Sequence, residues 1–225
     1  LMQREIDVMG AALEAPQRPF VAILGGAKIA DKIALIGNLL DRCDAILIGG
    51  GMAFTFLRAL GGDIGMSLCD DAALDTARVL LAKSREKNVP LCLPVDAVCG
   101  KEFKNDTERA VCNALHIPAD FAGYDIGPET AKQFAERIVG AKTVVWNGPM
   151  GVFEMPSFAE GTRAVACAVA ECGGVTIIGG GDSAAAVEQL GFANRVTHIS
   201  TGGGAALEFL EGRTLPGVAC LPDKN

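Results

Sequence analysis

The stretch Val175–Ala184, VTIIGGGDSA, carries residue types that can hold a phosphate. Its first four residues are uncharged and β-branched, as in a short buried strand. Three glycines follow, and Asp182 and Ser183 then open a run that is typical of a helix. Glycine lets a backbone approach an anion, and the free N–H groups of a first helical turn point toward it. Asp182 either caps its helix or holds Mg²⁺, because a hard cation prefers carboxylate oxygens. Ser183 either donates to a phosphate or simply begins the helix.

Two lysines follow another glycine pair, Gly25-Gly26. Lys28 and Lys32 are four residues apart, so they share one face of the helix predicted over Ala27–Cys43, where like charges repel by roughly 0.2–0.5 kcal/mol. Cations near this end also oppose the helix dipole. A bound anion would relieve both costs. The alternative is a solvated lysine face that Asp31 partly neutralises.

A few other polar residues lie close to predicted strand ends. Asn147 and Glu154 flank a Pro-Met-Gly turn, and Glu154 either accepts ribose hydroxyls or is a surface carboxylate. Asp96 is either a helix cap or a second polar group at the same edge. His198 lies inside a predicted strand, where a satisfied core residue is the simpler interpretation. Because no histidine base or cysteine nucleophile stands out, acid–base or covalent hydrolysis is poorly supported.

Short apolar runs alternate with helical patterns along most of the chain. Helices are predicted over 27–43, 52–60, 70–88, 128–139, 157–172 and 205–211, and strands over 19–24, 45–48, 89–95, 143–146, 175–178 and 196–200. The strand runs lack period-2 alternation, so both faces of their sheet should be covered. This order predicts an α/β fold: a three-layer, doubly wound, Rossmann-like sheet of about six parallel strands with helices on both faces. The irregular segment 97–123 is expected to hold a hairpin or small extra strands.

Glycine-rich loops follow five of the six predicted strands. Since crossover helices make neighbouring strands parallel, the loops GGAK, GGGM, PVD, NGPMG, GGGDS and TGGG should meet at one edge. Ligands of such sheets bind outside the carboxyl ends of the strands. This many glycines exceeds what turns alone require.

The known nucleotide signatures give a divided result. The P-loop pattern GxxxxGK[ST] is absent, whereas Gly179-x-Gly181-x-x-Ala184 fits the loose dinucleotide fingerprint. That fingerprint also requires an acidic residue about 20 positions further on, at the end of the next strand. Here the next strand ends in Thr201-Gly202, and no acid follows before Glu208. A nicotinamide-dependent dehydrogenase is therefore the weaker alternative.

Composition limits the choice of partners. The chain has 225 residues, 50% of them hydrophobic, and a formal net charge of -7, which disfavours nucleic acid as a partner. No apolar run approaches the roughly 20 residues that span a bilayer, so we expect no membrane partner. No charged-then-apolar segment opens the sequence, so we expect no secretory leader. Its eight cysteines form no CxxC pair, which favours reduced thiols in a cytoplasmic protein.

Taken together, these motifs resemble the phosphoglycerate kinase family. The matching stretches are Gly25–Lys32 (GGAKIADK), Ile48–Phe56 (IGGGMAFTF), Asp125–Thr130 (DIGPET), Trp146–Glu154 (WNGPMGVFE), Gly179–Ala184 (GGGDSA), His198–Leu210 (HISTGGGAALEFL) and Leu215–Gly217 (LPG). They cover the whole chain but only the C-terminal half of the family pattern. The resemblance implies an inter-domain linker helix over 1–14 and a nucleotide-binding domain over 15–225. The chain begins abruptly, without an initiating Met, so we expect it to be a fragment that lacks the family's N-terminal, 3-phosphoglycerate-binding domain.

The resemblance also implies roles at matching positions. Lys28 and Lys32 would contact nucleotide phosphates, and Asp182 would hold Mg²⁺. The residues lining the nucleoside site would be Gly26, Ala27, Gly50, Gly127, Asn147 and Pro149, with Glu154 on the ribose. The remaining phosphate contacts would come from Gly180, Gly181, Ser183, Gly202 and Gly203. Those nearest the transferred phosphoryl group would be the catalytic residues Lys32, Gly180 and Gly203.

The implied function is phosphoryl transfer between ATP and 3-phosphoglycerate, giving ADP and 1,3-bisphosphoglycerate in glycolysis. Such transfer needs positioning and charge neutralisation more than acid–base chemistry. ATP or ADP would be the substrate bound here, Mg²⁺ the metal, and 3-phosphoglycerate would bind only through the missing domain. We expect a monomer that binds nucleotide without turnover. A non-catalytic nucleotide-sensing module remains a third interpretation.

Overall fold

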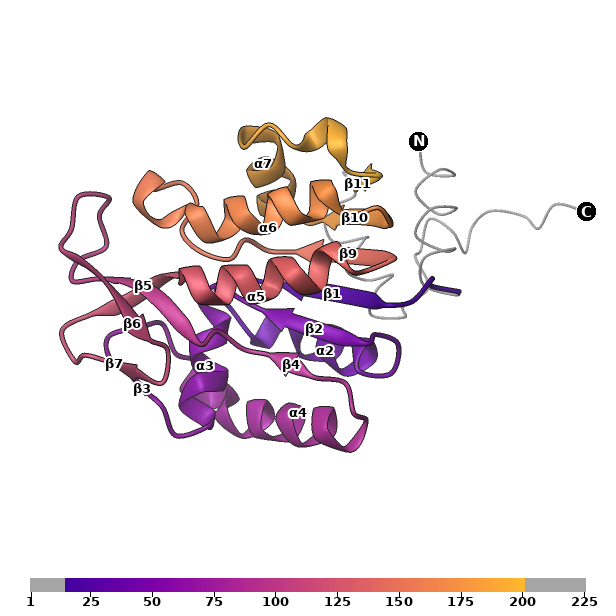
Figure 1. Cartoon of the computed structure of the whole chain (residues 1–225). Coiled ribbons are helices and arrows are strands. Elements are labelled where there is room, and N and C mark those ends of the chain that lie inside the picture. The colour runs from indigo at the N-terminus through magenta and orange to yellow at the C-terminus, as the bar shows by residue number, and fades with distance from the viewer. Residues whose placement is uncertain (1–14, 201–225) are drawn as a thin grey trace, which may run out of the picture.

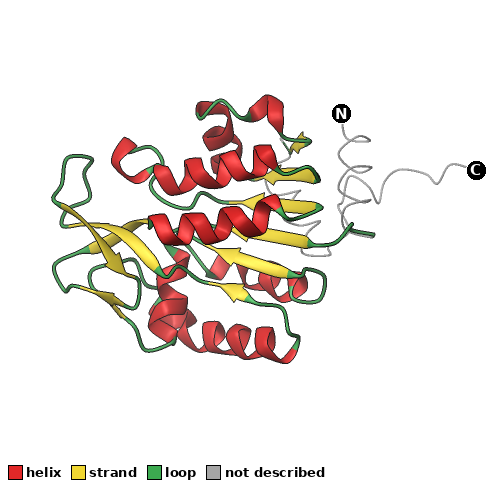
Figure 2. Cartoon of the chain, in the orientation of Figure 1, coloured by secondary structure: helices red, strands yellow, loops and turns green. Residues whose placement is uncertain are grey.

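The computed structural model describes residues 15–200 of this α/β chain. Figures 1 and 2 show a central sheet with helices on both faces and a smaller group of strands beyond one end of it. The α-helices are α2 (Ile33–Leu39), α3 (Met52–Ala59), α4 (Leu74–Glu86), α5 (Pro128–Val139), α6 (Glu160–Glu171) and α7 (Gly181–Gln189). The strands are β1 (Phe20–Leu24), β2 (Ala45–Ile48), β3 (Asp63–Ile64), β4 (Leu91–Cys92), β5 (Asp96–Gly100), β6 (Arg109–Asn113), β7 (His116–Ile117), β8 (Ala122–Ile126), β9 (Thr143–Asn147), β10 (Val175–Gly179) and β11 (His198–Ile199).

The main sheet has six strands in the order β11-β10-β9-β1-β2-β4. All of its pairings are parallel, with β1 hydrogen-bonded to both β2 and β9 at its centre. The chain runs outward from β1 in one direction and then returns to β9 to fill the other side. This confirms the predicted doubly wound sheet, and it places the loops after β1 and β9 beside each other.

Each face of the sheet is buried under helices. Alternate residues of β1 point to opposite faces: Ala22 and Leu24 pack in the core with α2, α3 and α4, whereas Val21 and Ile23 pack with α5, α6 and α7. Every residue of β1, β2 and β9 is buried, as the unbroken apolar runs predict. The core thus holds the strand ends, and the loops that follow them, in fixed relative positions.

Several predicted helices begin later than their sequence patterns indicate. The helix predicted over 27–43 is a 3-10 turn, Ala30–Lys32, followed by the short α2, because the loop after β1 is first hydrogen-bonded to its neighbours. Those predicted over 70–88 and 157–172 likewise open with 3-10 turns, Asp71–Ala73 and Pro156–Phe158. Lys28 therefore precedes the helix on which we placed it.

The outer strands of the sheet are shorter than predicted. The strand expected over 89–95 contributes only β4, since Pro90 and Pro94 flank it and lack the N–H that a ladder needs. The sixth strand, expected over 196–200, is reduced to β11, which pairs only with Ile177 and Ile178. His198 is half-buried on this strand, not in the core.

The irregular segment 97–123 contributes most of the strands of two small sheets. Strands β6, β5 and β8 make a three-stranded antiparallel sheet, and β3 pairs with β7. The prediction of a hairpin or small extra strands is therefore confirmed. We call the three-stranded sheet β6-β5-β8 the subsidiary sheet. It lies near the end of the main sheet where β8 leads into α5, as Figure 1 shows.

Other predictions meet the structure only in part. Of the cysteines described, Cys43, Cys99 and Cys112 are buried, four are half-buried, and all are free thiols. Among residues 15–200, no helix is long and apolar enough to cross a membrane. The predicted linker helix, the helix over 205–211 and the site residues Gly202 and Gly203 lie outside the described residues.

Candidate functional site

Three glycine loops at the carboxyl edge of the sheet are hydrogen-bonded to one another. Gly25 N–H donates to the Asn147 carbonyl at 2.9 Å, and Gly26 N–H donates to the Pro149 carbonyl at 3.0 Å. Gly50 N–H donates to the Met150 carbonyl at 2.9 Å. The loops after β1, β2 and β9 are thus one assembly. Some of the glycines in these loops therefore allow the loops to pack against one another, a role that the sequence analysis did not assign to them.

Gly50 and Gly148 combine a left-handed backbone with a lack of room for a side chain. Gly50 has a φ of +66°, and a Cβ on it would lie 2.5 Å from the Gly26 nitrogen. Gly148 has a φ of +95°, and a Cβ there would overlap the Gly25 carbonyl. Both positions combine a left-handed backbone with a close approach, so glycine is required at each.

A cleft of about 450 Å³ lies beside these loops, between the start of α7 and the β1 loop. It brings together most of the residues predicted to hold phosphates. They are Lys28, Lys32, Gly180, Gly181, Asp182 and Ser183, together with Gly26, Ala27 and Asn147 of the predicted nucleoside site. The structure thus brings into one cleft residues that are far apart in the chain.

Asn147 holds Lys32 in place. The Lys32 ammonium donates to the Asn147 side-chain oxygen Oδ1 and, at 3.2 Å, to its backbone carbonyl. The Asn147 amide in turn donates to the Gly179 carbonyl at 2.9 Å. A Cβ on Gly180 would lie 2.8 Å from the same amide nitrogen, where φ is +90°. Asn147, predicted to border the nucleoside, therefore positions the lysine.

The charge of Lys32 is poorly solvated in this cleft. Burial lowers its pKa from 10.5 to about 8, although the nearby carboxylates of Asp182 and Asp31 oppose the shift. A cation with so little water around it gains strongly from an anionic ligand. The cleft therefore holds a lysine whose protonated form a phosphate would stabilise.

Asp182 and Ser183 differ in their surroundings. Asp182 is exposed to the cleft, and no described side chain caps α7, whose N-cap residue is Gly180; the capping alternative for Asp182 is thus wrong. Ser183 is fully buried, and its hydroxyl accepts a hydrogen bond from Gly148 N–H at 2.5 Å. The Ser183 side chain therefore fastens the β9 loop, and the free N–H groups of this first helical turn remain available to a ligand.

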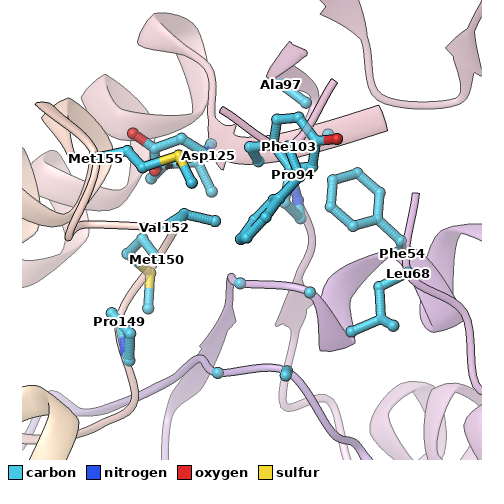
Figure 3. A pocket seen from close by; sticks show the side chains of 18 of the residues that line it. Phe54, Leu68, Pro94, Ala97, Phe103, Asp125, Pro149, Met150, Val152 and Met155 are labelled. Carbon is cyan, nitrogen blue, oxygen red and sulfur yellow. Dashed lines mark hydrogen bonds between the residues drawn. The ribbon is translucent and has the colours of Figure 1, made fainter. Parts of the chain in front are cut away.

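A second cavity, of about 680 Å³, adjoins the cleft through Gly26, Ala27 and Asp182. It is mostly apolar. Figure 3 shows Phe54 and Leu68 on one side of it and Met150 and Val152 on the other. A planar, hydrophobic group such as a nucleobase fits these surroundings.

Several cavity residues were missed by the sequence analysis. Phe103 lines the cavity although it is 65% exposed, and it packs edge-on against Tyr124 with ring centroids 5.4 Å apart. Tyr124 lies on β8 of the subsidiary sheet, and Phe103 lies in the loop between β5 and β6, within the segment predicted to be irregular. In the sequence, each of them is only an isolated aromatic residue, which does not by itself indicate a binding site.

Asp125 lies in the wall of this cavity and is only 3% exposed. Burial raises the pKa of its carboxyl to about 8, against the opposing effect of hydrogen bonds from Gly161 and Ile126 N–H. The Glu160 carboxylate adds to the rise. The DIGPET stretch thus places a carboxyl in the cavity wall that the sequence analysis had not singled out.

The remaining predicted residues occupy different positions. Pro149, Gly50 and the exposed Glu154 line the apolar cavity. Gly127 is buried against the Asp96 carboxylate, and it lines neither of these two cavities. Asp96 itself accepts hydrogen bonds from the backbone N–H groups of Glu129 and Thr130, so its alternative as a helix cap, for α5, is confirmed.

Comparison with known proteins agrees with this geometry. The family model described as phosphoglycerate kinase matches residues 1–213. The chain belongs to the phosphoglycerate kinase family. A phosphoglycerate kinase of Clostridium botulinum (strain Alaska E43 / Type E3) is 57% identical over 223 residues, and one of Dictyoglomus turgidum is 54% identical over 227.

Solved phosphoglycerate kinase structures share the fold. The enzyme from Coxiella burnetii superposes with a TM-score of 0.95 at 44% identity, covering 97% of this chain and 57% of that one. The enzyme from Pyrococcus horikoshii OT3 gives 0.84 at 32% identity. The chain spans about half the length of its curated relatives, 56% in the C. botulinum comparison.

Proposed function

We propose that this chain is the nucleotide-binding half of a phosphoglycerate kinase and that it binds MgADP and MgATP. The observation that carries the proposal is the junction of two cavities: a cationic cleft with Lys28 and Lys32, and an apolar cavity that opens from it. Phosphates and a nucleoside need these two environments side by side. We also propose that the chain is monomeric and that its second substrate, 3-phosphoglycerate, binds outside it.

Each group in the cleft has a part in this binding. The N–H groups at the start of α7 and the Lys32 ammonium would neutralise the phosphate oxygens, while Asn147 keeps the lysine oriented. Phosphoryl transfer depends mainly on such positioning and neutralisation. The apolar cavity would exclude water from one side of the nucleotide and fix its base.

Asp182 fits the Mg²⁺ that this reaction uses. Among residues 15–200, no group of three or more His, Cys, Asp or Glu side chains could hold a metal by itself. Mg²⁺ is commonly held by one or two carboxylates together with substrate phosphates. An exposed Asp182 between the lysines and the cavity suits that arrangement, and the ion would supply charge neutralisation on the phosphates.

Asp182→Ala should weaken MgADP binding by at least about tenfold, because the metal loses its protein ligand. Binding of ADP in EDTA should stay nearly unchanged. Asp31→Ala is the matched control, since it also removes a carboxylate near Lys32. Isothermal titration calorimetry with and without Mg²⁺ measures both. Equal losses with and without Mg²⁺ would argue that Asp182 acts on the lysine instead of on a metal.

The purified 225-residue chain should bind MgADP but show no phosphoryl transfer with 3-phosphoglycerate, because the acceptor site lies elsewhere. A coupled assay of ADP release measures this directly. NAD is the control ligand, since a dehydrogenase domain would prefer it to ADP. Substantial turnover by the chain, with a contaminating kinase excluded, would contradict the proposal. Tighter binding of NAD than of ADP would do the same.

A further inference from the structure

The buried carboxyl of Asp125 joins two elements that meet behind the apolar cavity. Its Oδ1 accepts the Ile126 N–H at 2.9 Å within β8, and its Oδ2 accepts the Gly161 N–H at 2.7 Å in the first turn of α6. No described side chain caps α6 from its own N-cap position. Asp125 therefore provides this helix start with an acceptor from the neighbouring strand.

One wall of the cavity packs on this junction. The loop 150–155 passes so close that a Cβ on Gly151 would overlap the Asp125 carboxylate. Met150 N–H donates to the Thr162 hydroxyl of α6 at 3.1 Å, and Val152 N–H donates to the β8 backbone at 2.8 Å. Figure 3 shows Asp125 beside Met155 at the edge of that wall. The loop is thus held between β8 and α6, and Asp125 is the side chain that ties those two together.

The lysine of the phosphate cleft is held by contacts that do not include Asp125. Lys32 is held by Asn147, and Asn147 by the Gly179 carbonyl, so the cleft rests on the loops after β1, β9 and β10. A change at Asp125 should therefore move the nucleoside wall without moving the lysine.

We propose that Asp125 is a positioning residue for the nucleoside cavity: by joining β8 to the first turn of α6, its carboxyl group fixes the wall formed by residues 150–155. This inference rests on the proposed function, since it assigns the cavity to the nucleoside of a bound nucleotide. It predicts a selective loss of nucleoside recognition, with phosphate binding retained.

The test compares two ligands on the 225-residue chain by calorimetry: MgADP, and magnesium tripolyphosphate, which lacks a nucleoside. Asp125→Asn keeps the side-chain volume but turns one acceptor into a donor that faces an N–H group. We expect it to weaken MgADP binding by about tenfold and to change tripolyphosphate binding by less than about twofold. Gly151→Ala pushes on the same wall from the loop side, and it should give the same selectivity if Asp125→Asn does not fold.

Asp96→Asn is the matched control. Asp96 also caps a helix from a neighbouring strand, accepting the Thr130 N–H at 2.8 Å, but it does not line the cavity. It should lower the melting temperature and leave both affinities unchanged. Equal weakening of both ligands by Asp125→Asn, unchanged binding of both, or the same selectivity in Asp96→Asn would overturn the inference alone. A wild-type chain that binds tripolyphosphate but not ADP would overturn the proposed function as well.

Discussion

Lys32→Met should weaken ADP binding by about 10–100-fold at pH 7, the effect of losing a charge-assisted contact in a poorly solvated cleft. The substitution also leaves the Asn147 side-chain oxygen, which now accepts from the lysine, without its donor. Lys142→Met is the matched control, because Lys142 is exposed and directly precedes β9, at the opposite edge of the sheet. Fluorescence or calorimetric titration with ADP measures both variants.

The pH dependence of ADP binding gives the same residue a sharper test. Burial lowers the pKa of Lys32 to about 8, so the free protein loses this charge as the pH rises through 8. A phosphate favours the ammonium, so binding above pH 8 should take up a proton, and wild-type affinity should fall by about tenfold from pH 7 to pH 9. Lys32→Met should lack this part of the pH dependence. A wild-type affinity that stays constant over this range would contradict the assignment.

The contribution of Lys32 to folding stability should change with pH in the opposite direction to its contribution to ADP affinity. Between pH 8 and the unperturbed 10.5, the unfolded chain holds the Lys32 proton and the folded chain does not. Stability contributed by this lysine therefore rises with pH over that window. The free energy of unfolding should rise more steeply with pH in the wild type than in Lys32→Met, as urea titrations at pH 7.5 and 9.5 would show.

The sequence predicts the centre of this fold better than its margins. Strands such as Phe20–Leu24 and Val175–Gly179 are buried on both faces, so an unbroken apolar run identifies them almost to the residue. Antiparallel β6 is exposed at alternate positions and begins with the charged Arg109. Its sequence therefore lacks the unbroken apolar run that identifies the central strands. Strand β4 is limited by two prolines, whose effect on the ladder depends on the partner strand.

The candidate site divides in the same way. Lys28, Lys32 and Asp182 could be placed together from sequence because topology alone brings the strand ends to one edge. Phe103 and Tyr124 could not, since the β5–β6 loop and strand β8 that present them have no recognisable period. The contact between Ser183 and Gly148 N–H depends on side-chain direction, which spacing does not reveal.

Gly148→Ala should be among the most damaging single substitutions in the chain. At a φ of +95° an alanine costs about 1–3 kcal/mol of backbone strain, and its methyl group would also overlap the Gly25 carbonyl. We expect a loss of about 3 kcal/mol or more, or roughly 6–12 °C in melting temperature for a chain of this size. Thermal and urea denaturation measure the loss.

Alanine substitutions at two other glycines separate the cost of backbone strain from the cost of steric overlap. Gly191 has a φ of +80° but no atom within 4 Å of its Cβ position, so Gly191→Ala should cost only about 1–2 kcal/mol. Gly37 lies within α2 with open space around it, and Gly37→Ala should stabilise by about 0.5–1 kcal/mol. If Gly148→Ala costs no more than Gly191→Ala, the close packing of the loops does not limit stability. Because the Gly148 loop also begins at Asn147, which orients Lys32, the larger loss should be accompanied by weaker ADP binding, whereas Gly191→Ala should leave that affinity unchanged.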